Sequence, residues 1–114
     1  MDRTSSFRRI VAKRIRHLAR VRDLAAEGFE FVANPALVVR RMDVVRYVAT
    51  RLGVVAGNRL CADVRAAVAS LGWEAVDTGG YAFFRNVKPR NMSTDEALAT
   101  SREERRKARY GQAK

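Results

Sequence analysis

Four basic residues are regularly spaced near the N-terminus of this chain. They stand at i, i+4, i+7 and i+11 and are Arg9, Lys13, Arg16 and Arg20. On an α-helix this spacing places all four side chains on one face, and no acidic residue follows them before Asp23 and Glu27. Such a row of cations can bind successive phosphates of a nucleic-acid backbone and release counterions. A solvated face without a partner is the alternative. We favour polyanion binding, because a purely structural helix normally mixes both signs of charge.

A predicted β-hairpin over residues 73–87 supplies a second set of candidate residues. Arg85, Lys88 and Arg90 follow its aromatic residues and could contact a phosphate backbone. The alternative is that the aromatic residues pack in the core and the cations are merely solvated. We expect both in part, with one strand face packed inward while Arg85 and Lys88 reach outward. Tyr81 could stack on a base or pack across the strands.

The third set lies in the strongly charged C-terminal segment. Arg105, Arg106 and Arg109 could form an arm that becomes ordered when it binds nucleic acid. A self-paired helix is the alternative, since Glu103 and Lys107 stand at i and i+4. The sequence leaves both interpretations open.

Residues that could support catalysis or metal binding are few. The single histidine, His17, lies among Arg14, Arg16 and Arg20, where a structural role or a phosphate contact is a better interpretation than a general base. The single cysteine, Cys61, falls on the apolar stripe of its predicted helix, as expected of a buried thiol. Because neither a Cys/His cluster nor a paired carboxylate arrangement is present, we expect a protein that is not an enzyme and needs no metal or cofactor.

The charge of the chain is concentrated at its two ends. The 114 residues form one domain of ordinary size, with a net charge of +11. Residues 1–22 hold eight Lys/Arg and one acid, and residues 85–114 hold nine Lys/Arg and four acids, whereas residues 23–84 hold six Arg and seven acids. A nearly neutral folded core with cationic extensions is therefore predicted. Its natural partners are polyanions.

Cysteine usage and hydropathy bear on the compartment. One cysteine excludes a disulfide within the chain, and no apolar run approaches the length of a membrane span. We therefore expect a cytoplasmic protein, associated with a nucleoid or a virion, and no membrane partner. An organelle transit peptide is the alternative reading of the Arg-rich start. We disfavour it because Asp2 is unusual in such a peptide and residues 6–27 read as a regular helix.

The elements that position these residues give a mainly α fold with a small β-hairpin, that is, an α+β protein. Apolar periodicity predicts helices over residues 6–27, 36–53 (one helix or two) and 59–71. Strands are expected at 73–77 and 81–87, and Ser93 and Glu96 are spaced as a capping box before a last helix that reaches about residue 109. We divide the chain into a basic helix and connector (1–33), a core (34–89) and a basic C-terminal helix and tail (90–114).

The order of three helices and a hairpin resembles a winged-helix domain over residues 36–88. The most telling stretch is Gly79–Gly80–Tyr81–Ala82–Phe83–Phe84–Arg85–Asn86–Val87–Lys88, which is similar to the wing of the winged-helix module at the end of viral and phage primase–helicases. The chain has no phosphate-binding loop, so the resemblance implies only the binding module. It also implies that the helix from Asn58 to Leu71 reads the major groove. The outward positions of that helix include Arg59, Asp63, Arg65, Ala66 and Ser70.

Together these observations predict a winged-helix DNA-binding accessory or regulatory protein of phage, plasmid or bacterial type. Its basic ends would bind the phosphate backbone, with DNA favoured over RNA. One alternative is an RNA-binding component of a ribonucleoprotein. Another is a structural or assembly protein, for instance of a virion, whose cationic arms hold an acidic partner or a packaged genome. A homo-oligomer or a larger assembly is compatible with each of these functions.

Overall fold

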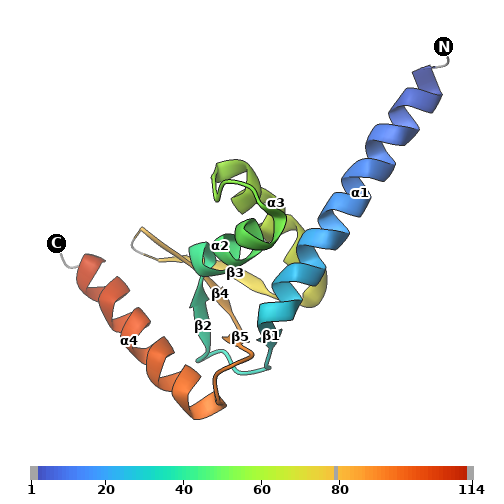
Figure 1. Ribbon diagram of the computed structural model, residues 1–114. Coiled ribbons are helices and arrows are strands. Elements are labelled where there is room, and N and C mark those ends of the chain that lie inside the picture. Colours follow the sequence, from blue (N-terminus) through green and yellow to red (C-terminus); the bar gives the residue numbers. More distant parts are fainter. Residues whose placement is uncertain (1–2, 79, 113–114) are drawn as a thin grey trace.

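A computed structural model describes residues 3–78 and 80–112, with side chains for 6–78 and 80–109. The helices are α1 (Arg3–Gly28), α2 (Arg41–Leu52), α3 (Asn58–Val68), the short η1 (Ala69–Leu71) and α4 (Thr94–Gln112). The strands are β1 (Phe29–Phe31), β2 (Val38–Arg40), β3 (Glu74–Thr78), β4 (Tyr81–Arg85) and β5 (Val87–Pro89). The predicted class, mainly α with a small amount of β, is confirmed (Figure 1). Gly79, placed in the predicted turn, and residues 113–114 of the predicted tail lie outside the described residues.

The strands form two small antiparallel sheets. One has the order β2-β4-β3, with Val39 and Ala75 both opposite Phe84, and the other pairs β1 with β5. The predicted hairpin is therefore present, but three strand assignments were missed or wrong. β1 was predicted as a connection, β2 as part of a helix, and β5 as the end of the strand at 81–87. Asn86, at φ 66°, separates β4 from β5, and asparagine tolerates this left-handed conformation better than most residues.

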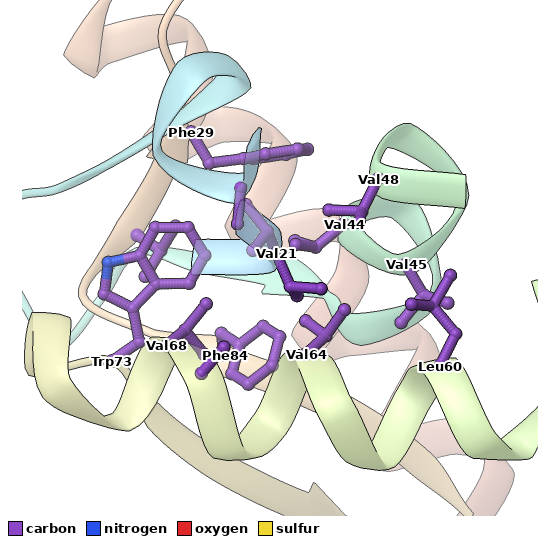
Figure 2. Packing of buried hydrophobic residues seen from close by; sticks show 14 of the residues in the cluster. Val21, Phe29, Val44, Val45, Val48, Leu60, Val64, Val68, Trp73 and Phe84 are labelled. Carbon is purple, nitrogen blue, oxygen red and sulfur yellow. The ribbon is translucent and has the colours of Figure 1, made fainter. Parts of the chain in front are cut away.

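The main core lies between the β2-β4-β3 sheet and the helices α1, α2 and α3. Phe84 is fully buried at its centre, with the ring of Trp73 packed against it at a centroid distance of 5.8 Å (Figure 2). Val21 and Ala25 of α1 belong to the same cluster. The core therefore reaches beyond the predicted segment 34–89 into the helix that was assigned to an extension.

Helix α4 covers the opposite face of this sheet, where Ala108 packs with Val38 and Phe83. The buried Ser101 hydroxyl accepts a hydrogen bond from Val38 N–H (3.0 Å) and donates one to Val38 O (3.1 Å). Through this one side chain α4 satisfies both main-chain groups of a residue on the edge strand β2, which would otherwise be open to pairing. The predicted capping box is present in part, since Glu96 N–H donates to Ser93 Oγ at 3.2 Å. The helix is thus docked on the fold, and it extends beyond the predicted end at residue 109.

Helix α1 contributes buried apolar side chains to the globule only from its C-terminal half. Val21 and Ala25 are buried, whereas residues 6–16 are exposed with the exception of the half-buried Ala12. The first turns of the helix project away from the other elements (Figure 1). The apolar stripe predicted along residues 6–27 therefore leaves the core part-way along the helix and continues into solvent.

Candidate nucleic-acid interface

The four predicted cations of α1 form one exposed surface, which we call the α1 cationic face. Its members are Arg9, Lys13, Arg16 and Arg20. All four are exposed, and none forms a hydrogen bond or ion pair with another described residue. At a rise of 1.5 Å per residue the row extends over roughly 16 Å. Its positive charge is therefore not neutralised by the described part of the molecule and is available to a polyanion.

The fold brings a cation of α3 to the edge of this face. Lys13 and Arg59 line the same groove of about 470 Å³ between the projecting helix and the connection from α2 to α3. Arg59 is exposed and also makes no ion pair with a described residue. Arg8 has the same two properties and was missed by the sequence analysis, because it falls beside the regular spacing rather than on it. The surface available to phosphate is therefore wider than the predicted row.

A buried carboxylate fixes the direction of α1. Arg14 donates a hydrogen bond to Asp63 Oδ1 of α3 at 2.7 Å, and His17 Nε2 lies 3.0 Å from Oδ2. Asp63 was predicted to face outward, and this was wrong, since only 6% of the residue is exposed. Burial by itself would raise the pKa of Asp63, but the hydrogen bonds from Arg14 and His17 outweigh it and lower the pKa below its ordinary value.

Replacing Asp63 by Asn is expected to lower the free energy of unfolding at pH 7 by about 1–2 kcal/mol, because buried polar contacts lose their charge. Arg14 and His17 remain partly exposed, so water can replace part of what they lose. The lowered pKa means that the contribution of Asp63 is present above the unfolded-state pKa of about 4 and disappears as the pH falls through the folded-state value. Urea denaturation at pH 7 and near pH 3 measures both effects.

The matched control for this prediction is Asp23→Asn. Asp23 also pairs with an arginine of α1, but its side chain is 70% exposed, so we expect a change within about 0.5 kcal/mol at both pH values. A difference between wild type and Asp63→Asn that stayed constant from pH 7 to pH 3 would contradict the assigned role of the carboxylate.

The outward face of α3 carries the two predicted arginines. Arg59 and Arg65 are exposed and make no ion pair with a described residue. Arg65 lines a shallow pocket of about 540 Å³ together with Arg41 and Asn58. Arg41 itself is buried, with its guanidinium 5.5 Å from the centre of the Phe84 ring and Nη2 3.5 Å from Asp77. On α3, the cations that remain available are therefore Arg59 and Arg65.

The hairpin residues are less available than the sequence suggested. Lys88 was expected to reach outward, which was wrong: it is buried, pairs with Glu30 at 2.7 Å, and donates hydrogen bonds to the carbonyls of Pro89 and Met92. The hydrogen bond from Lys88 lowers the pKa of Glu30. Arg85 pairs with Glu74 at 3.3 Å.

Two other residues near the hairpin also have partners within the fold. Arg90 pairs with Glu30 and donates to the carbonyl of Ala26. Tyr81 stacks on Phe83, with ring centroids 6.2 Å apart. Most of the polar and aromatic side chains predicted near the hairpin to bind nucleic acid therefore have partners within the fold.

The C-terminal candidates are similarly divided. Arg105 donates to the carbonyl of Ala36 at 2.7 Å, and Arg106 pairs with Glu103 at 2.7 Å. The predicted partner of Glu103 was Lys107, which instead lies 3.8 Å from Glu104. Arg109 is exposed without an ion pair to a described residue and lines a groove of about 330 Å³ with Arg85 and Arg105. Of this set, Arg109 is the most accessible to a ligand.

The remaining candidates are metal-ligating groups, the single cysteine and membrane-spanning helices. No group of three or more histidine, cysteine or acidic side chains that could hold a metal ion occurs in residues 3–78 and 80–112. Cys61, expected to be buried, is half-buried and unpaired. Among the described helices, none combines the length and the apolar character that crossing a bilayer requires.

The candidate site of this chain is thus an exposed row of cations on a projecting helix, extended by the arginines of α3. Comparisons with protein-family models, with curated proteins and with solved structures found no match.

Proposed function

We propose that this chain is a nucleic-acid-binding protein that holds the phosphate backbone of duplex DNA on the α1 cationic face. The observation that carries the proposal is the exposure of four cations in one row with no described carboxylate to neutralise them. A cation that already pairs with a carboxylate in the fold adds less to the free energy of binding, because it must give up that ion pair to contact a phosphate. Unpaired cations exchange only counterions and water.

The arrangement of elements supports a winged-helix type of binding module. Three helices precede the β3-β4 hairpin, and α3 leads through η1 directly into it. In the family that the sequence resembles, this helix enters the major groove. On α3 the side chains available for that role include Arg59 and Arg65. Asp63 is turned toward α1, so its carboxylate does not oppose phosphate on that face.

The outward face of α3 offers little for reading bases. Apart from the two arginines it presents small side chains such as Ala62 and Ala66, and specificity requires hydrogen-bonding or apolar groups fitted to base edges. We therefore assign most of the affinity to phosphate contacts and only modest sequence preference to α3, as suits an accessory protein.

Fluorescence anisotropy with labelled duplex DNA and with a structured RNA of equal length tests the proposal. With four to six phosphate contacts, the affinity for DNA should fall roughly 10²–10³-fold between 50 and 200 mM salt. Affinity that did not depend on salt, or the absence of binding at low salt, would refute the phosphate assignment. RNA bound at least ten times more tightly than DNA would identify a ribonucleoprotein component instead.

A further inference from the structure

The projecting half of α1 exposes large apolar side chains that nucleic-acid binding does not use. The exposed fractions are 67% for Phe7, 67% for Ile10, 40% for Val11 and 62% for Ile15. These residues continue the stripe that is buried farther along the helix, where Val21 and Ala25 belong to the core. An amphipathic stripe of this kind ordinarily faces a partner surface.

The connection between α2 and α3 adds two valines to this surface. Val54 is 52% exposed and Val55 is 87% exposed, and both line the groove of about 470 Å³ in which Ile10 also lies. We call the combined surface the α1 apolar patch. It consists of Phe7, Ile10, Val11, Ile15, Val54 and Val55.

Free cations border this patch but are not its members: Lys13 and Arg59 line the groove beside Ile10, and Arg8 lies beside Phe7 and Val11. The α1 cationic face lies on the other side of the helix, because its members are out of phase with the apolar stripe by about half a turn. Arg14 does fall within the stripe, but it is paired with Asp63 at 2.7 Å. The centre of the patch is therefore apolar and carries no free charge, whereas its border is basic.

We propose that a second copy of this chain covers the α1 apolar patch, with two α1 helices packed stripe to stripe about a two-fold axis. The six side chains together expose roughly 600 Å², the upper end for the largest apolar patch of a typical monomer. Two such patches in full contact bury at most about 1,200 Å², which reaches the lower end of a standard protein interface. A self-complementary surface on one molecule is what a two-fold dimer requires.

The electrostatics favour a second copy over an acidic partner protein. An acidic surface would be attracted first to the α1 cationic face, which holds four unpaired cations in one row, rather than to the apolar stripe. Two copies packed through the apolar stripe direct Arg9, Arg16 and Arg20 of both copies outward, which limits the repulsion between them and leaves them open to polyanions. This inference does not depend on nucleic-acid binding, because its test is made without nucleic acid and because Lys13 is the one member of the cationic face that lines the groove of the patch.

Sedimentation velocity of the full chain, free of nucleic acid and at about 0.5 M salt, tests the proposal. We expect a dimer with a dissociation constant of roughly micromolar order. Ile10→Glu combined with Ile15→Glu should raise this dissociation constant at least ten-fold and so shift the chain toward the monomer. The matched control, Arg9→Glu combined with Arg16→Glu on the opposite face, should remain dimeric. Circular dichroism checks that both variants keep the wild-type helix content.

Crosslinking provides a second readout that does not depend on the charged variants. In a Cys61→Ser background, Val11→Cys should give a dimer with a short bis-maleimide, whereas Arg16→Cys should not. A wild-type chain that stays monomeric at 100 µM, on the order of a hundred times the expected constant, would overturn the proposal, as would equal crosslinking at the two positions. A monomer that floats with phosphatidylserine vesicles through the same patch would also overturn it and identify a lipid surface as the occupant.

Discussion

Replacing all four residues of the α1 cationic face by Gln should weaken binding to duplex DNA about 10²–10³-fold near 0.15 M salt. Each phosphate contact contributes close to 0.9 to the slope of log K against log salt. The slope of the variant should therefore be smaller by about 3 to 4. The difference between wild type and variant should shrink toward zero near 1 M salt, where counterion release no longer favours binding. Anisotropy titrations over a salt series measure both quantities.

A control with the same change in net charge separates contact from bulk electrostatics. Arg22, Arg51, Arg85 and Arg106 are also on the surface, but each pairs with a carboxylate at 3.3 Å or less. Replacing these four by Gln removes as much positive charge, and we expect less than about a ten-fold loss of affinity, since isolated surface pairs contribute little. Equal losses in the two variants would mean that net charge, rather than the α1 cationic face, governs binding.

Phe84→Ala should produce the largest loss of stability of any single substitution considered for this chain. The ring is fully buried on β4, meets Trp73 at 5.8 Å and lies beneath the guanidinium of Arg41. Removing it leaves a cavity and takes away the aromatic face over which a buried cation is held, so we expect a loss of about 3–5 kcal/mol in the free energy of unfolding. Urea denaturation followed by circular dichroism measures this loss.

Phe31→Ala is the matched control for this substitution. The same side chain is removed from β1, where it is 47% exposed. Because this substitution removes far less buried apolar surface than Phe84→Ala does, we expect the free energy of unfolding to change by about 1 kcal/mol or less. If the two variants were equally destabilised, the main core would not be centred on the β4 residue as described.

Local signals in the sequence were enough to predict the helices and the hairpin. The periodicity of residues 6–27 and the capping position at Ser93 each act within a few residues, and the structure contains both features. The strand β2 was missed because Val38 also fits the helical stripe predicted over residues 36–53. Its extended form depends on pairing with β4 and on the Ser101 hydroxyl, 63 residues away.

In the candidate site, too, some features follow from local sequence spacing and others depend on residues far away in the chain. The exposure of the α1 cationic face follows from spacing within one helix, which can be read directly from the sequence. The burial of Lys88 depends on Glu30, and the turning of Asp63 toward α1 depends on Arg14. These partners are 49 or more residues apart, and no spacing rule connects them. The sequence alone therefore does not distinguish a basic residue that pairs with a distant carboxylate from one that stays unpaired.

The separation of the outer half of α1 from the globule has a consequence for its helical state. Between residues 6 and 16 there is almost no core packing to hold the backbone, and short helices without such support are only marginally stable in water. Like charges at i and i+4, as at Arg9 and Lys13, oppose helix formation further. Coil-to-helix equilibrium and charge neutralisation are therefore thermodynamically linked in this segment. A polyanion that reduces the repulsion between these cations also shifts the segment toward the helical state. Its measured affinity therefore includes the free energy of that ordering.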